Sequence, residues 1–188
     1  FTVPIRCTQN PTMGEEWRRG WDPENIKPKV TDQKALVVGS GPAGLECAVQ
    51  LSRRGYEVVL AESKNKLGGR VLFESSLKGL SAWKRVVDNR VHEILQKNNI
   101  EVYTESRLTA ELIDELDIKN IFLATGSSWR KDGIGRSRRN RIQGLETISV
   151  YSPEEAVENY KDFNGPLVIY DDEQGYMAGV VADHLNDK

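Results

Sequence analysis

The sequence predicts an α/β fold with a doubly wound, parallel β-sheet that carries helices on both faces. Two observations support this prediction. Short apolar runs alternate with segments of helical spacing from residue 34 onward, and this alternation is typical of parallel sheets built from βαβ units. In addition, a glycine-rich turn at residues 39–44 joins the first apolar run to the first expected helix, as in folds that bind dinucleotides.

The expected elements follow one another closely along the chain. An apolar run at residues 34–39 precedes a helix over 42–54, which Gly55 terminates, and a strand at 56–62 completes a right-handed βαβ unit. The later elements are a helix that Ser81 caps, a strand at 100–103, a helix at 109–116, a strand at 120–125, a helix that begins at Ser152 and Pro153, a buried strand at 167–170 and a helix at 176–185. In the helix after Ser81, the spacing places six side chains on one buried face: Trp83, Val86, Val87, Val91, Ile94 and Leu95.

Three parts are expected along the chain. Residues 1–33 hold four of the seven prolines and two of the four tryptophans, which indicates an extended linker with at most a short helix at 14–19. Residues 34–150 form the main α/β domain, and residues 151–188 form the truncated start of a second such domain or a returning segment. Because the chain starts at Phe1 rather than Met, we expect it to be a piece of a longer polypeptide, called the parent protein below.

The composition excludes several classes of protein. There are 26 Lys and Arg against 28 Asp and Glu, a formal net charge of −2, 38% hydrophobic residues and 2 cysteines in 188 residues. These values argue against a disordered chain and a disulfide scaffold. No apolar run approaches the ~20 residues that a membrane helix needs, and no overall basic field attracts nucleic acid. Since the chain also has no secretory pattern, we expect a cytoplasmic protein that binds neither membranes nor nucleic acids.

The clearest functional signal is Gly-Ser-Gly-Pro-Ala-Gly at residues 39–44, which fits the pattern G-x-G-x-x-G. Between a strand and a helix, this pattern is typical of Rossmann-like dinucleotide sites. Gly39 permits the tight turn, Gly41 lets the pyrophosphate approach the backbone, and Gly44 lets the helix pack close to the sheet. The helix N-terminus offers N–H groups and partial positive charge to the phosphates. The alternative is a tight turn that binds no ligand.

Glu62, at the end of the second expected strand, is the candidate ribose ligand. It lies 62 − 39 = 23 residues after Gly39, close to the spacing at which an acidic residue binds the ribose hydroxyls in such folds. Its carboxylate would repel a 2′-phosphate, which disfavours NADP at this site.

Two more glycine-containing motifs follow. Leu67-Gly68-Gly69-Arg70 can pass close to a nucleotide, with Arg70 neutralising phosphate, and Thr125-Gly126 ends the fourth strand either beside the nucleotide or as an ordinary strand exit. Together with the fingerprint and Glu62, these motifs resemble the two-dinucleotide-binding-domain flavoproteins, whose first site holds FAD or its ADP half. The predicted cofactor-binding residues are Gly39, Ser40, Gly41, Pro42, Ala43, Gly44, Glu62, Ser63, Gly69, Arg70, Thr125 and Gly126.

The N-terminal segment carries a more specific resemblance. The strings RCTQNPT at 6–12, GEEWRRGW at 14–21, LSAW at 80–83, ATGSSW at 124–129 and SPE at 152–154 resemble the trimethylamine dehydrogenase family, with its dimethylamine and histamine dehydrogenases, over essentially the whole chain. The resemblance implies an iron–sulfur flavoprotein parent in which an FMN-carrying barrel oxidises an amine. A [4Fe-4S] cluster then passes electrons to an electron-transferring flavoprotein. It also implies ADP in the first nucleotide domain and a homodimeric parent.

By position in that family, Cys7 matches the fourth cluster cysteine, and the other three have no counterpart in this sequence. A [4Fe-4S] cluster normally needs four thiolates, so neither the cluster nor FMN is expected in this chain. The alternative for Cys7 is a free thiol. Cys47 is expected in the core, and His92 and His184 lack the spacing of metal ligands.

Two segments toward the C-terminal end are rich in charge. Asp171, Asp172 and Glu173 follow the expected strand at 167–170, where a pyrophosphate would need hydrogen-bond donors, so we expect no NAD(P) at a second site. Residues 130–141 contain six basic residues and one acid. Because aromatic residues and a recognition helix are missing there, a solvated loop is favoured over a nucleic-acid or phosphate site.

The leading hypothesis is therefore an adenine-nucleotide-binding fragment of an amine dehydrogenase, inactive by itself, with no catalytic residue to name. The resemblance favours ADP over FAD. There is also a physical reason, because contacts to a flavin would come from a C-terminal part of the fold that the sequence does not contain. One alternative is part of an FAD- and NAD(P)H-dependent reductase of the 2,4-dienoyl-CoA reductase type, which would require a competent second fingerprint. The other is a structural domain with an empty site.

Overall fold

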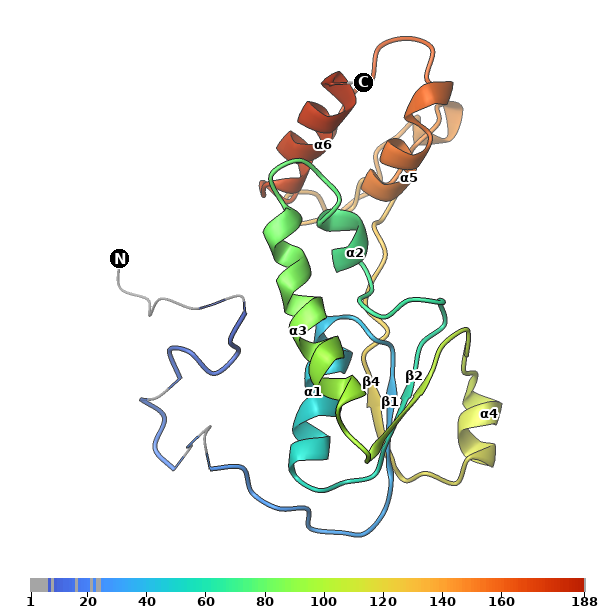
Figure 1. The fold of residues 1–188 in the computed structure, drawn as a ribbon. Helices are drawn as coiled ribbons and strands as arrows, with labels where there is room; N and C mark the ends of the chain where they lie inside the picture. The colour runs from blue at the N-terminus through green and yellow to red at the C-terminus, as the bar shows by residue number, and fades with distance from the viewer. Residues whose placement is uncertain (1–6, 8, 16, 21, 23–24, 188) are drawn as a thin grey trace. The chain divides into compact units, whose positions relative to one another are not determined.

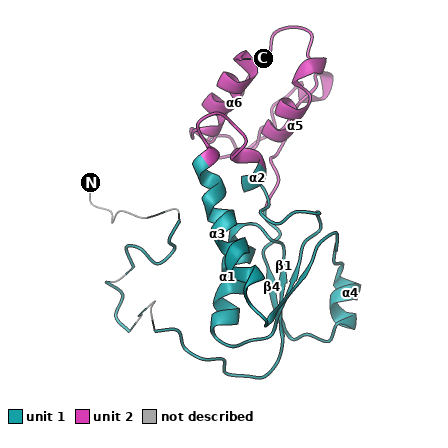
Figure 2. Ribbon diagram, in the orientation of Figure 1, with its two compact units in different colours: residues 1–72, 82–126 teal, residues 73–81, 127–188 magenta. Residues whose placement is uncertain are grey.

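The computed structural model describes residues 7, 9–15, 17–20, 22 and 25–187. The chain divides into two compact units (Figure 2). Unit 1 comprises residues 1–72 and 82–126, and unit 2 comprises residues 73–81 and 127–188. The chain thus changes unit after residues 72, 81 and 126, and the expected domain boundaries at residues 34 and 151 stay predictions.

Unit 1 contains a four-stranded parallel sheet in the order β3-β2-β1-β4. The strands are β1 (Ala35–Val38), β2 (Val58–Ala61), β3 (Ile100–Tyr103) and β4 (Asn120–Leu123). Val37 lies opposite Leu60 on one side and Phe122 on the other. The parallel α/β architecture predicted from the alternating pattern is therefore confirmed.

One face of this sheet is covered by α1 (Pro42–Arg53) and α3 (Lys84–Leu95). Their apolar side chains join alternate residues of β1 and β2 in the main core of unit 1, which includes Val37, Leu45, Leu60, Val87 and Ile94. The opposite face is less covered than expected. Of the helices in the described part of the chain, α4 (Ala110–Glu115) alone lies on that side in Figure 1, and none of its residues is buried.

Unit 2 consists of short helices joined by loops. It contains α5 (Pro153–Glu158), α6 (Met177–Asn186) and the 3₁₀ turns η2 (Leu145–Thr147) and η3 (Tyr160–Asp162). The expected start of α5 is confirmed, because Ser152 forms a capping box with Glu155 and Pro153 is the first helical residue. A small core of Leu77, Met177 and Val181 holds the unit together. Two short helices, α2 (Val71–Glu74) and η1 (Ser81–Trp83), lie where the chain passes between units.

Two predictions about local structure are wrong. Ser81 does not cap the long helix. It begins η1, and α3 starts after Trp83 without a side-chain cap. Leu95 leaves the predicted apolar face and is 75% exposed, because it lies in the last turn of α3, beyond the edge of the core. The helix that the sequence allowed at residues 14–19 is not seen among the described residues of that range, which form turns; residue 16 lies outside the described part.

The expected buried strand at residues 167–170 is also wrong. These residues form no strand, and Val168 is 92% exposed. A strand requires a neighbouring strand to accept and donate its backbone hydrogen bonds. All four strands of the described residues belong to unit 1, so the apolar run in unit 2 has no sheet to join.

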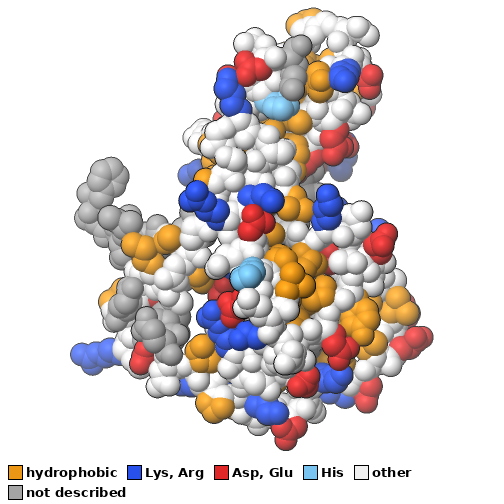
Figure 3. Space-filling view, viewed as in Figure 1, with side chains coloured by type: hydrophobic (Ala, Val, Ile, Leu, Met, Phe, Trp, Pro, Cys, Tyr) orange, Lys and Arg blue, Asp and Glu red, His pale blue; other side chains and the backbone are white. Residues whose placement is uncertain are grey.

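The surface agrees with the balanced composition. On the face seen in Figure 3, acidic and basic side chains are interspersed rather than gathered into a field of one sign. Within the described part of the chain, every helix is too short or too polar to cross a membrane.

Candidate nucleotide-binding site

Ser40, directly after β1, brings three of the predicted motifs together. Its side chain is fully buried. Its backbone N–H donates to Glu62 Oε2 at 2.9 Å and its hydroxyl donates to the same oxygen at 2.5 Å. Its carbonyl accepts the N–H of Gly68 at 2.9 Å. The fingerprint turn, the end of β2 and the double-glycine loop therefore meet at one residue.

Two of the fingerprint glycines are required by the packing of the chain itself. Gly39 has a φ of +100°, and a Cβ there would lie 2.8 Å from the carbonyl carbon of Ala124. A Cβ on Gly44 would collide with the carbonyl group of Gly39. These contacts let the first turn of α1 and the end of β4 approach the fingerprint turn closely, as the motif predicts.

Gly41 is different, because nothing in the chain requires a glycine there. Its φ is −65°, and a Cβ would meet no atom within 4 Å. It is the N-cap of α1, which has no side-chain cap and begins with Pro42. The first N–H groups of a helix have no partner within the helix, so open space adjoins an uncapped, electropositive helix end. This arrangement fits a pyrophosphate.

Glu62 is 6% exposed and accepts four hydrogen bonds. Besides the two from Ser40, Oε1 accepts the backbone N–H of Lys64 at 2.9 Å and the hydroxyl of Ser63 at 3.1 Å. Burial would raise the pKa of Glu62, but these hydrogen bonds outweigh burial and lower it. The carboxylate is therefore ionised at neutral pH. A ribose hydroxyl that binds Oε1 would displace the hydroxyl of the exposed Ser63, which can rotate away.

The remaining predicted residues lie around this centre. Gly69 passes over the fingerprint, and a Cβ on it would lie 2.9 Å from Gly41 Cα. Arg70, half-buried, ends the same loop. Ala43 is exposed in the first turn of α1. Thr125 and Gly126 are exposed and follow Ala124, whose N–H donates to the carbonyl of Val38. Nucleotide binding by each of these residues stays a prediction.

The cysteines and histidines form no metal centre within the described residues. Hydrogen bonds from the backbone N–H groups of Asn10 and Gln9 lower the pKa of the Cys7 thiol. Burial raises the pKa of Cys47, which packs at the edge of the core of unit 1. Because a [4Fe-4S] cluster normally needs four thiolates and the sequence has two cysteines, the residues of this chain do not by themselves fit a cluster.

The acidic run in unit 2 binds its own chain. Asp172 accepts the N–H of Ser137 through both carboxylate oxygens at 3.0 and 3.1 Å, and Asp171 accepts the N–H of Gln174 at 2.9 Å. A Cβ on Gly135 would lie 2.9 Å from the carboxyl carbon of Asp172. Carboxylates thus occupy the loop in which a second pyrophosphate would need donors.

Half of the cations between residues 130 and 141 are paired with carboxylates. Arg130 and Arg141 contact Asp132, and Lys131 contacts Glu155. The Arg130 guanidinium holds the pKa of Asp132 at about 2. The internal pairing is in keeping with the predicted solvated loop.

Ser40 was predicted as a cofactor-binding residue but not as the partner that holds Glu62, and Arg90 was not predicted to have a role. The signal for Ser40 was its place between two fingerprint glycines, but its pairing with Glu62 depends on the parallel register of β1 and β2. Arg90 is 7% exposed on the apolar face of α3. A charged residue inside an apolar stripe was the available signal.

A parallel sheet with a glycine turn at the start of a helix and an acidic residue after the second strand defines a dinucleotide-binding α/β protein. Residues 23–156 match the profile of the family described as pyridine nucleotide-disulphide oxidoreductase. The chain belongs to this family, whose domain binds FAD or NAD(P).

The predicted resemblance to the amine dehydrogenases is also confirmed. The chain is 36% identical to dimethylamine dehydrogenase of Hyphomicrobium sp. (strain x) over 96% of its own length and 26% of the relative. Histamine dehydrogenase of Rhizobium sp. 4-9 is 45% identical with a TM-score of 0.87, covering 97% of this chain and 27% of that chain. The 6-hydroxypseudooxynicotine amine oxidase of Pseudomonas geniculata N1 is 40% identical with a TM-score of 0.85, covering 97% and 28%. The chain thus spans about a quarter of the length of these relatives.

Proposed function

We propose that unit 1 binds ADP, with the pyrophosphate at the N-terminus of α1 and the ribose at Glu62. The observation that carries this proposal is the open, uncapped helix end at Gly41, next to a carboxylate that Ser40 holds in place. Gly39 and Gly44 shape the turn, and Gly69 and Arg70 cover it. ADP, rather than whole FAD, is favoured by the resemblance to the trimethylamine dehydrogenase family.

The parent protein is proposed to oxidise a small amine with FMN and to pass the electrons through a [4Fe-4S] cluster to an electron-transferring flavoprotein. The relatives are named as amine dehydrogenases and an amine oxidase, which supports an oxidoreductase acting on an amine. Cys7 would supply the fourth cluster ligand in such a parent. The 188-residue chain alone is proposed to have no amine dehydrogenase activity.

A second nucleotide site is not proposed in unit 2. Asp172 accepts backbone hydrogen bonds in the loop after residues 167–170, and a dinucleotide phosphate would be repelled by the three neighbouring carboxylates. This observation disfavours a reductase of the 2,4-dienoyl-CoA reductase type, which needs NAD(P)H at a second site.

The test is to identify and titrate the nucleotide. The purified chain is denatured, and any released nucleotide is identified by mass and absorbance. The nucleotide-free chain is then titrated by calorimetry with ADP, FAD, NADH and NADPH. Binding of ADP without tight NADPH binding is the expected result. Release of a flavin, or tight binding of NADPH, would contradict the proposal, and binding of none of the four would identify a structural domain.

A further inference from the structure

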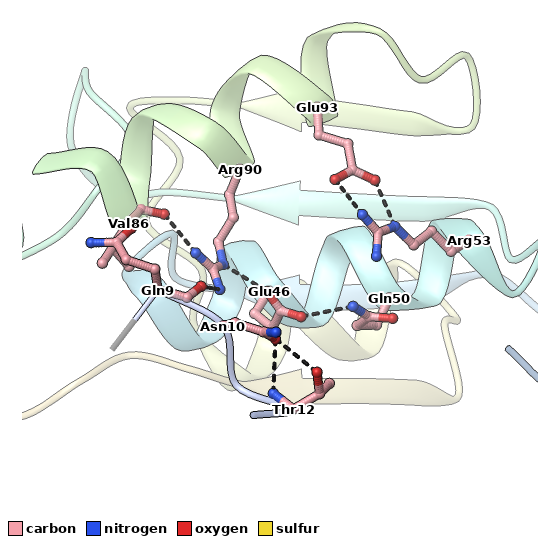
Figure 4. A network of polar contacts seen from close by, with 9 residues as sticks. All are labelled: Gln9, Asn10, Thr12, Glu46, Gln50, Arg53, Val86, Arg90 and Glu93. Atoms are coloured by element: carbon pink, nitrogen blue, oxygen red, sulfur yellow. Dashed lines mark hydrogen bonds and ion pairs between the residues drawn. The ribbon is translucent and has the colours of Figure 1, made fainter. Parts of the chain in front are cut away.

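Arg90 is a buried cation that connects three separate segments (Figure 4). From α3, its Nε donates to Glu46 Oε2 on α1 at 2.6 Å. Its Nη1 donates to the carbonyl of Val86 at 2.9 Å, and its Nη2 donates to the carbonyl of Gln9 at 3.2 Å. The last bond spans 81 residues of sequence and attaches the N-terminal segment to the helix pair.

Glu46 supplies the opposite charge that the buried Arg90 requires, and both of its carboxylate oxygens accept hydrogen bonds. A buried charge is strongly destabilising unless an opposite charge and further hydrogen bonds satisfy it. Glu46 meets this requirement, because Oε2 accepts from Arg90 and Oε1 accepts from Gln50 at 2.7 Å. Both partners of the ion pair are therefore held in one arrangement.

Arg90 is not required to join α1 to α3, because another ion pair already does so. Arg53 and Glu93 already link the same two helices through two hydrogen bonds of 2.7 Å, in a more exposed position. The contribution of Arg90 beyond that pair is its bond to the Gln9 carbonyl.

The segment that Arg90 contacts has local order of its own. We call residues 7 and 9–12 the Cys7 segment. Cys7 Sγ accepts the N–H of Gln9 at 3.4 Å, and Asn10 Oδ1 accepts the N–H and the hydroxyl of Thr12 at 3.0 and 2.7 Å. Gln9 is thus bonded to Cys7 through its N–H and to Arg90 through its carbonyl.

We propose that Arg90, supported by Glu46, is a positioning residue that holds the Cys7 segment on the α1–α3 pair and so fixes the Cys7 thiol relative to the nucleotide site. Glu46 lies on the helix that begins at the fingerprint, 46 − 41 = 5 residues after Gly41. The inference rests on the proposed function, because it takes the turn at residues 39–44 as the nucleotide site relative to which Cys7 is held.

The test measures backbone hydrogen–deuterium exchange in the 188-residue chain by mass spectrometry, in one peptide that contains the Cys7 segment and one peptide of α1 that contains Cys47; the two exchange rates are called the Cys7 rate and the Cys47 rate. In Arg90→Met, the Cys7 rate should rise about fivefold, the factor that corresponds to one net hydrogen bond, and the Cys47 rate should stay constant. The matched control is Arg53→Met, which breaks the other α1–α3 pair and should leave both rates unchanged. Arg90→Lys keeps the charge beside Glu46 but lacks the forked donors, so it should raise the Cys7 rate and keep the fold.

An equal rise in both rates, or the same Cys7 rise in Arg53→Met, would show general loosening of the helix pair and overturn the inference. If Arg90→Met does not fold, the test rests on Arg90→Lys. An unchanged Cys7 rate in Arg90→Lys would reject the positioning role. ADP titration of the same proteins keeps the two proposals separate. Wild-type chain that fails to bind ADP contradicts the proposed function, while the Cys7 rates still report on Arg90.

Discussion

Glu62 Oε2 accepts both the backbone N–H and the hydroxyl of Ser40, at 2.9 and 2.5 Å. The pair joins the turn after β1 to the end of β2, and Ser40 also binds Gly68. The chain's own hydrogen bonds thereby hold the proposed nucleotide site in one arrangement, which would reduce the ordering that binding requires.

The first prediction concerns the pH dependence of stability. The pKa of Glu62 in the folded chain lies below its ordinary value of 4.5, so the unfolded chain binds more protons in this range. The stabilisation from Glu62 is therefore present above about pH 4.5 and is lost as the pH falls through the lower, folded-state pKa. At pH 7, the free energy of unfolding of Glu62→Gln should be about 2 kcal/mol lower than that of wild type. This difference in unfolding free energy should shrink below about pH 4.5.

Urea unfolding of both proteins from pH 7 to pH 3 measures this difference. Ser40→Ala removes one of the four hydrogen bonds that Glu62 accepts. The pH-dependent part of the unfolding free energy should therefore be smaller in Ser40→Ala than in wild type. A difference between wild type and Glu62→Gln that is constant across the range would show that the pKa of Glu62 is the same in the folded and unfolded chains.

The second prediction separates the two kinds of fingerprint glycine. Gly44→Ala should lower the free energy of unfolding by about 1–3 kcal/mol, because its Cβ collides with Gly39. Gly41→Ala should cost at most about 1 kcal/mol, because its Cβ meets nothing in the chain and only the N-cap preference for Gly over Ala opposes it. It should nevertheless weaken ADP binding about tenfold or more, because the Cβ fills the proposed phosphate space. Gly41→Asp should abolish ADP binding by adding a like charge.

Urea denaturation and calorimetric titration measure the two effects independently. If Gly41→Asp binds ADP like wild type, the fingerprint assignment is wrong. Loss of stability in Gly41→Ala equal to that in Gly44→Ala would instead assign Gly41 a packing role.

Local patterns were sufficient to predict most of unit 1. The apolar runs of β1 and β2, the glycine turn and the spacing to Glu62 follow from requirements that lie within a few residues of one another. The prediction of a strand at residues 167–170 failed because an apolar run does not reveal whether a neighbouring strand is available to pair with it. The prediction that Leu95 is buried failed because helical periodicity does not show where the core beneath the helix ends.

The candidate site shows the same limit. The motifs placed Gly39, Gly41, Gly44 and Glu62 in one region, but the hydrogen bonds that join them depend on the lateral pairing of β1 with β2. Arg90 illustrates the limit most clearly, since its partners Glu46 and Gln9 lie 44 and 81 residues away in the sequence. No local pattern predicts contacts at such separations.

The third prediction concerns the capping box of α5. Ser152 Oγ accepts the N–H of Glu155 at 3.2 Å, and Glu155 accepts the N–H of Ser152 at 2.8 Å. Ser152→Ala should therefore destabilise unit 2 by about 1 kcal/mol. Thr109→Ala at the start of α4 is the comparison, because Thr109 accepts a longer bond of 3.4 Å from Leu112 and should cost less. Chemical denaturation followed by circular dichroism measures both, and a larger loss in Thr109→Ala would contradict the ranking.

The last prediction tests whether residues 167–170 are as exposed as the structure places them. Val168 is 92% exposed, whereas Leu60 in β2 is fully buried. Val168→Ala should change the free energy of unfolding by less than about 0.5 kcal/mol, as exposed substitutions usually do. Leu60→Ala should cost about 2–5 kcal/mol, because it leaves a cavity between β2 and the helices above it. Equilibrium urea unfolding of the two variants gives the comparison. A loss of more than about 1 kcal/mol in Val168→Ala would mean that this side chain is buried in the folded protein, and the strand expected from the sequence would regain support.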